Sequence, residues 1–453
     1  MPKAYLPDLV WADGWHREAL VVDDHGVVVS LGEPPIGAAV ERLAGRALLP
    51  GLVNAHSHAF QRAIRGRTEY RSSDEDDFWS WRDQMYRAAA AISPDELRAV
   101  SRAAFLEMLR AGITSAGEFH YLHRDPKGRP YGDPAELEHQ VLAAAADVGL
   151  RLVLLRVAYA RGGPGKAAAG AQLRFCDDSI DGYVRACEAL AGKAAVGVAP
   201  HSVRALPREW LAPLGDFAAR RGLPVHVHLA EQRKEVEACV AEHGRRPVEL
   251  CDAEGLLGER FTAVHAIHLA PAEIARLGAT RSSVCACPTT ERNLGDGVVP
   301  APALLQAGAT VALGSDGQSQ IDLLEDAREL DYHLRLATER RAVLGPRSGD
   351  RASLARVLFS AATEGGARSL ALPTGALRPG APADFFTVDL ADLSIAGTAE
   401  DALLPSIVFG LARGAVREVA VQGNVVLRDG RHAQEERTVR ELERSMEALW
   451  ARA

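Results

Sequence analysis

Two histidines separated by one residue, His56 and His58, end the apolar segment ALLPGLVNAHSH. In an extended strand, side chains two residues apart point to the same side, so both imidazoles can reach one point in space. Three other apolar segments also end in groups that bind metal or move protons. These groups are His228 with Glu231, His265, and Asp316. The pattern therefore predicts a site that combines several imidazoles with carboxylates.

We interpret four of these residues as the ligands of one divalent metal ion: His56, His58, His228 and Asp316. Neutral imidazoles and a carboxylate suit Zn²⁺, and Fe²⁺ accepts the same ligands. A second ion would need a bridging lysine or carboxylate at the end of the fourth predicted strand. That strand ends in Ala199, Pro200 and His201, which favours a single ion.

The remaining groups of the set can transfer protons. A metal ion that keeps an open position activates water for attack at neutral pH. Asp316 can accept a proton from that water, and His265 can orient or polarise it. Glu231, three residues after His228, can carry a proton to a nitrogen of the substrate. We therefore expect Glu231, His265 and Asp316 to be the catalytic residues of a hydrolase.

Strand-like and helix-like segments alternate through the middle of the chain, which predicts a parallel sheet. Eight such units predict closure into a (β/α)8 barrel, in which the chemistry lies at the carboxyl ends of the strands. The predicted strands lie within residues 47–58, 114–121, 152–159, 195–202, 224–231, 262–269, 283–290 and 310–317. The candidate site residues fall at these ends, which supports the barrel more strongly than any single motif.

Both ends of the chain have short β-like segments joined by glycine-containing turns. Residues 19–32 read ALVVDDHGVVVSLG, a strand, a turn and a strand. We predict a small β-sandwich domain from residues 1–48 and 373–432, beside a catalytic barrel over 49–372. A helix within 433–453 should dock on the body of the protein, starting near Thr438, which has the capping-box spacing with Glu441.

Composition excludes several classes of protein. The net charge of −8 argues against nucleic acid or an anionic membrane as the main partner. No apolar run reaches the roughly 20 residues that span a bilayer, and the first residues do not have a signal-peptide pattern. Six cysteines without a CxxC spacing indicate reduced, packed thiols. We expect a cytoplasmic enzyme that acts on a small molecule.

Two connections are longer than the others and are predicted to be functional. The connection after the first strand contains Phe78, Trp79 and Trp81 beside Arg82, and we expect an ordered lid with an active-site arginine. Its acidic run, Asp74 to Asp77, is interpreted as a solvated face. The connection after the third strand, RGGPGKAAAGAQLRFCDD, is rich in glycine and alanine.

Taken together, these motifs resemble the amidohydrolase superfamily, in its mononuclear deaminase branch. The resemblance rests on the HxH pair, HVHLAEQ, the histidine of the sixth strand and GSDGQSQIDLLEDAREL, and it spans nearly the whole chain. The longer stretches NAHSHAFQRAIRG, FWSWRDQMY and CPTTERNLGDG resemble members that hydrolyse N-formimidoyl-L-glutamate to N-formyl-L-glutamate and ammonia. The resemblance also implies pairing into a homodimer. In one departure from the pattern, Gly317 stands after Asp316 where a serine is expected.

This resemblance implies a dicarboxylate substrate and a set of residues that contact it. Arginine binds a carboxylate in bidentate geometry, so Arg82 and Arg204 suit the two carboxylates. The resemblance adds three further contacts: Gln61, Tyr121 and His201.

Several alternatives remain open from the residues alone. A deaminase of a guanine-like heterocycle would use the same metal centre with an aromatic pocket. The intact ligand set disfavours an inactive scaffold. The fourth strand, which ends without a bridging lysine or carboxylate, disfavours a binuclear hydrolase of cyclic amides. Formimino-aspartate differs from the glutamate substrate by one methylene, which typically gives only about 10–200-fold discrimination.

Overall fold

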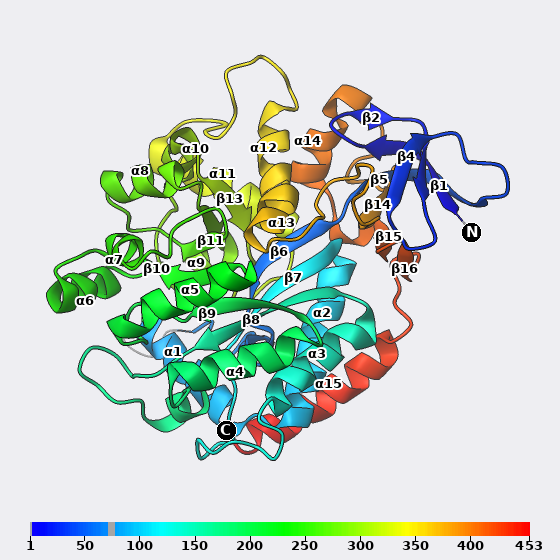
Figure 1. Ribbon diagram of the computed structural model, residues 1–453. Helices are drawn as coiled ribbons and strands as arrows, with labels where there is room; N and C mark the ends of the chain where they lie inside the picture. Colours follow the sequence, from blue (N-terminus) through cyan, green and yellow to red (C-terminus); the bar gives the residue numbers. More distant parts are fainter. Residues whose placement is uncertain (1, 71–77) are drawn as a thin grey trace.

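Eight parallel strands form a nearly closed barrel at the centre of the molecule (Figure 1). The computed structural model describes residues 2–70 and 78–453. The strands follow one another around the barrel in sequence order, and all eight predicted segments are confirmed. They are β6 (Leu52–Ser57), β7 (Ile113–His120), β8 (Arg151–Ala158), β9 (Ala195–Pro200), β10 (Val225–Leu229), β11 (Phe261–His265), β12 (Ser283–Ala286) and β13 (Thr310–Leu313).

The barrel closes between its first and last strands through residues of the predicted metal site. The amide of His58 donates to the carbonyl of Asp316 at 3.0 Å, and the amide of Asp316 donates to the carbonyl of His56 at 3.0 Å. Every residue of β6, β10 and β11 is buried. Strands that are covered on both faces have near-continuous runs of apolar residues, which explains the high apolar content of these segments.

Helices surround the barrel (Figure 1). Local sequence sets their ends: Ser93 caps α2 by accepting from the amide of Glu96, and Gly222 ends α5 in the left-handed conformation. They are α1 (Phe78–Ala91), α2 (Pro94–Arg110), α3 (Glu136–Val148), α4 (Ile180–Ala191), α5 (Leu211–Arg221), α6 (Arg233–His243), α7 (Pro247–Ala253), α8 (Pro271–Ala279), α9 (Pro288–Leu294), α10 (Ala301–Ala307), α11 (Leu323–Thr338), α12 (Ser353–Ser360), α13 (Gly366–Ser369), α14 (Glu400–Gly410) and α15 (Glu435–Trp450). Short helical turns are η1 (Ala59–Ile64), η2 (Gly170–Arg174), η3 (Arg208–Trp210), η4 (Ala361–Gly365) and η5 (Arg413–Ala415).

Strands from both chain ends share a second, mixed sheet beside the barrel (Figure 1). In its centre β14 pairs antiparallel with β5, with Phe386 opposite Leu49. The predicted hairpin is present, and the side chain of Asp23 accepts from the amides of His25 and Val27 in its turn. The strands are β1 (Lys3–Trp11), β2 (Trp15–His16), β3 (Ala19–Val22), β4 (Val28–Gly32), β5 (Ala39–Pro50), β14 (Phe385–Asp389), β15 (Val416–Val421) and β16 (Asn424–Leu427).

The C-terminal helix α15 docks on the barrel layer beside α2, as expected (Figure 1). Leu449 is fully buried, and the indole N–H of Trp450 donates to the carbonyl of Ala63 at 3.2 Å. The helix begins at Glu435 rather than near Thr438, so the expected capping box is wrong. The amide of Thr438 already donates to Gln434 within the first turn. Among the described helices, none has the length and apolarity needed to cross a bilayer.

Candidate metal centre and active site

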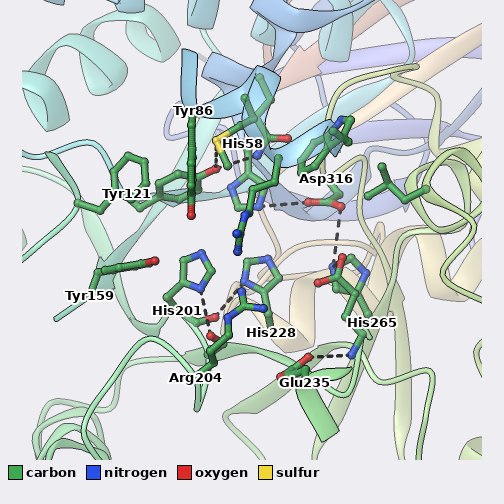
Figure 2. Close-up of a pocket in the computed structure, with 18 residues that line it drawn as sticks. His58, Tyr86, Tyr121, Tyr159, His201, Arg204, His228, Glu235, His265 and Asp316 are labelled. Carbon is green, nitrogen blue, oxygen red and sulfur yellow. Dashed lines mark hydrogen bonds and ion pairs between the residues drawn. The ribbon is translucent and has the colours of Figure 1, made fainter. Parts of the chain in front are cut away.

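The four predicted metal ligands converge at the carboxyl end of the barrel. Figure 2 shows three of them, His58, His228 and Asp316. His56 Nε2 lies 3.1 Å from both His58 Nε2 and His228 Nε2. Asp316 Oδ1 lies 3.3 Å from His56 Nε2 and 3.1 Å from His58 Nε2. All four residues are buried, so three nitrogens and one oxygen face one point from strands that are distant in sequence.

These distances fit a divalent metal ion. Bonds of 2.0–2.1 Å in a tetrahedral zinc site place neighbouring donor atoms about 3.3 Å apart. The donor separations of 3.1–3.3 Å match that spacing. The chain therefore has a buried metal-binding group of three histidines and one aspartate.

Hydrogen bonds behind the ligands orient two of the three imidazoles. The Nδ1–H of His58 donates to the carbonyl of Phe119 at 2.9 Å, and that of His228 donates to the carbonyl of His201 at 3.0 Å. Each bond leaves Nε2 as the free acceptor that a metal requires. Burial lowers the pKa of His56 to about 3 and the pKa of His228 well below its usual range, which keeps both rings neutral.

The two other predicted catalytic residues lie beside this group. His265 Nε2 is 3.9 Å from Asp316 Oδ2 and 3.8 Å from Glu231 Oε1, and His265 Nδ1 is 3.4 Å from Glu291 Oε1. Burial opposes charge on His265, but Glu231 and Glu291 outweigh it and raise its pKa well above its usual range. Burial raises the pKa of Glu231. Both pKa values are raised, and two titratable groups this close to each other can exchange a proton.

Strained backbone places these groups at the mouth of the barrel. His265 has φ of +66° and Asp316 has φ of +44°, and Ala230, just before Glu231, has φ of +52°. The left-handed region is uncommon for residues other than glycine and is concentrated at functional sites. At the ends of these three strands, the backbone therefore departs from the regular β conformation beside the metal-binding group.

A cavity opens next to the metal group and is lined by all five predicted substrate-binding residues. These are Gln61, Arg82, Tyr121, His201 and Arg204. The side-chain amide of Gln61 donates to the Tyr121 hydroxyl at 2.8 Å. A Cβ added at Gly317 would lie 3.2 Å from Gln61 Oε1, so the glycine found in place of serine gives this amide room.

The two arginines reach the cavity from different elements. Arg82 lies on α1, and Arg204, which is labelled in Figure 2, follows β9. The guanidinium of Arg161 donates to the carbonyls of Arg204 and Val203 at 3.1 and 3.2 Å and fixes the backbone of that loop. The side chains of Phe78 and Trp79 and the acidic run Asp74 to Asp77 lie outside the part that the structure describes, so the predicted lid is described only from Trp81 onward.

Sequence reasoning missed four polar residues of the cavity: Tyr86, Tyr159, Ser202 and Glu235. Tyr86 lies one helical turn after Arg82, and Glu235 lies four residues after Glu231. This spacing from a predicted site residue could have indicated both. Burial raises the pKa of Glu235 to about 7. Its carboxylate accepts from the amide of Glu231 at 3.2 Å, which ties the catalytic loop to α6.

Two histidines near the motif lie outside the site. His226 donates to the carbonyl of Ser369 at 2.9 Å in the barrel interior, and His268 does not line the cavity. A separate buried group contains His120, His123 and Glu138. Both ring nitrogens of His123 are already bonded, to Glu138 at 2.8 Å and to the carbonyl of Val157 at 3.0 Å, so this group is an internal polar network.

Fold and site together define a barrel hydrolase with a metal-binding group, and comparison with known proteins agrees. A model of the Amidohydrolase family matches residues 47–426, and the chain belongs to this family. Formimidoylglutamate deiminase of Pseudomonas aeruginosa is 38% identical over 445 residues, covering 97% of this chain and 96% of the relative. The 5-methylthioadenosine/S-adenosylhomocysteine deaminase of Halobacterium salinarum is 30% identical over 438 residues, covering 93% and 90%.

Solved structures have the same architecture. An amidohydrolase from Brucella melitensis superposes with a TM-score of 0.91 at 34% identity, covering 99% of this chain and 100% of that one. An adenosine deaminase from Xanthomonas campestris, solved with bound zinc, gives a TM-score of 0.83 at 24% identity, covering 99% and 98%. The second likeness concerns the fold alone.

Proposed function

We propose that this protein hydrolyses N-formimidoyl-L-glutamate to N-formyl-L-glutamate and ammonia. The observation that carries the proposal is the presence of Arg82 and Arg204 in the cavity that adjoins the metal-binding group. The substrate has two carboxylates and one amidine carbon, which match two guanidinium groups and one metal site. The 38% identity to a formimidoylglutamate deiminase over 97% of the chain supports the same reaction.

We propose zinc as the metal, since three imidazoles and a carboxylate are typical zinc ligands. Fe²⁺ accepts the same set. When bound, the metal supplies a water activated for attack at neutral pH. His56, His58, His228 and Asp316 would hold it.

The side chains around the metal group then have defined tasks. Arg82 and Arg204 bind the carboxylates and place the amidine carbon next to the metal group. Asp316 accepts the proton of the attacking water. His265, close to both Asp316 and Glu231, stabilises the tetrahedral centre, and Glu231 protonates the departing nitrogen, so ammonia leaves and the formyl group remains.

A substrate comparison tests this proposal. Ammonia release by the zinc-loaded protein is measured with N-formimidoyl-L-glutamate, N-formimidoyl-L-aspartate, 5-methylthioadenosine and S-adenosylhomocysteine. We expect the glutamate derivative to have the highest kcat/KM. Release from the nucleosides alone would contradict the proposal.

A heterocycle deaminase is the second candidate, and one observation favours it. The cavity is also lined by aromatic side chains that could stack on a base: Trp81, Tyr86, Tyr121, Tyr159 and Phe175. The relative from Halobacterium salinarum, named a nucleoside deaminase, covers 93% of the chain. The two arginines favour the dicarboxylate, since a neutral base offers them no charge to pair with.

A further inference from the structure

Two tyrosines form a polar part of the cavity wall away from the catalytic groups. Tyr86, from α1, and Tyr159, at the end of β8, line the same cavity as Arg82 and Arg204. In Figure 2, Tyr159 and Tyr86 lie on the side of the cavity opposite Asp316 and His265. Neither phenol has a place in the proposed proton transfers, so their hydroxyl groups need another explanation.

One glutamine behind the wall determines how both hydroxyls are hydrogen bonded. Gln172 Nε2 lies 2.9 Å from the Tyr159 hydroxyl and 3.2 Å from the Tyr86 hydroxyl. Gln172 Oε1 accepts from the amide of Ala169 at 3.2 Å. Because a backbone amide can only donate, this contact fixes which end of the side chain is the oxygen. The amide nitrogen must therefore donate to both phenols.

The long connection after β8 is built to hold Gln172 in this place. A Cβ added at Gly162 would lie 2.7 Å from the carbonyl oxygen of Ala167 and 2.9 Å from Gln172 Oε1, so a glycine here lets both atoms approach closely. Phe175 packs its ring 5.6 Å from Tyr159 and 6.0 Å from Tyr86, measured between ring centres. The glycine- and alanine-rich segment noted in the sequence thus reaches the cavity wall through Gln172 and Phe175.

Each phenol oxygen is an acceptor toward Gln172, so each phenol hydrogen is left for another acceptor. The two phenols are neighbours, and one hydrogen can be donated to the other oxygen. The remaining O–H is then available to a ligand in the cavity. Burial, and next the Tyr86 phenol, raises the pKa of Tyr159, so its hydroxyl is protonated at neutral pH.

We propose that Tyr86 and Tyr159 form a carboxylate-binding subsite, and that Gln172 is a positioning residue that directs their O–H groups into the cavity. Hydroxyl-to-carboxylate hydrogen bonds are short and strong, and here they would add to the charge of the nearby arginines. For the identity of the ligand, the subsite rests on the proposed function: it would bind a carboxylate of N-formimidoyl-L-glutamate away from the reacting carbon.

Direct binding of glutarate, a dicarboxylate without an amidine, tests the subsite without turnover. Calorimetry compares the zinc-loaded wild type with Tyr86→Phe, Tyr159→Phe and the double variant. We expect the double variant to bind glutarate at least ~10-fold more weakly, the scale of one hydrogen bond to a charged group. Tyr332→Phe, on α11 outside the cavity, is the matched control and should bind as wild type does. Unchanged affinity in the double variant would overturn the subsite.

Two substitutions of Gln172 test its positioning role. Gln172→Met keeps the volume and donates nothing, whereas Gln172→Glu would accept both phenol hydrogens and turn them away from the cavity. We expect Gln172→Glu to weaken glutarate binding more than Gln172→Met. The ratio of the dissociation constants of these two variants should fall by roughly 10-fold when both tyrosines are phenylalanine. A difference that stays the same in both backgrounds would be a charge effect alone and would overturn the positioning role.

These measurements separate the subsite from the reaction. If the tyrosine variants lose glutarate affinity while the wild type releases no ammonia from N-formimidoyl-L-glutamate, the subsite stands and the proposed reaction is wrong. If ammonia is released and the double variant keeps both its glutarate affinity and its KM, the reaction stands and the subsite is wrong. With both correct, KM rises in the double variant while kcat changes by less than about threefold.

Discussion

His58 Nε2 lies 3.1 Å from Asp316 Oδ1, although the two residues follow the first and the last strand of the barrel. The amide of His58 also donates to the carbonyl of Asp316 at 3.0 Å. Closure of the barrel and assembly of the metal ligands are therefore one structural event. A chain that closes its barrel correctly brings these two ligands together without any further movement.

The metal ligands can be tested by metal content alone. We predict that His228→Ala, which removes one of four ligands, lowers bound zinc after purification and dialysis, as measured by elemental analysis. The matched control is His226→Gln, two residues earlier on β10, which keeps a donor for the carbonyl of Ser369. Equal zinc content in His228→Ala and His226→Gln would show that His228 is not a ligand.

Substitution of Glu231 tests proton transfer independently of metal binding. We predict that Glu231→Gln retains zinc, because Glu231 is not in the ligand group, and that kcat falls about 10²–10⁴-fold, the usual contribution of a general acid or base. Glu237→Gln, an exposed change on α6, is the control for altered charge in the same region. Near-normal kcat in Glu231→Gln would remove this residue from the mechanism.

The polar network of Glu138 should make stability depend on pH. Burial opposes ionisation, but His123 and Arg156 outweigh it and lower the pKa of Glu138 to about 2. A carboxylate with a lowered pKa stabilises the fold above its unfolded value of about 4.3, and this stabilisation is lost as the pH falls toward 2. The contribution is on the order of 3 kcal/mol at neutral pH.

Urea unfolding from pH 6 to pH 3 measures this effect. We predict that the stability gap between the wild type and Glu138→Gln narrows as the pH falls. Glu136→Gln, on the same helix α3, controls for loss of a negative charge at that end of the barrel. A gap that is constant over this range would mean that Glu138 is not ionised with a lowered pKa in the folded protein.

The sequence predicted the metal ligands because each lies at the end of an apolar segment, where the fold rule for parallel barrels applies. His56 and His58 follow from strand periodicity, and Asp316 from the end of the eighth strand. The turn of His265 and Asp316 into the left-handed region was not predictable, since even Asp and His, which adopt it more often than most residue types, do so only uncommonly. Only their packing at the barrel mouth requires that conformation.

The far wall of the cavity was less predictable for a related reason. Tyr86 and Arg82 lie on α1, and Gln172 lies in a long connection, so their positions depend on contacts between elements distant in sequence. Local patterns can indicate that a long connection is functional, but they do not specify which side chain reaches the site. The start of α15 was misplaced for a simpler reason, because a capping-box spacing also occurs inside a helix.

The most direct test of the central claim is ammonia release from N-formimidoyl-L-glutamate by the zinc-loaded protein and its Arg82→Met variant. The control is Arg87→Met, an exposed residue on the same helix. We predict rapid release by the wild type and the control, and a KM raised roughly 10- to 100-fold in Arg82→Met, the scale of a lost hydrogen bond to a charged group. No release from the metal-loaded wild type, or an unchanged KM in Arg82→Met, would contradict a deiminase that holds its dicarboxylate substrate through this arginine.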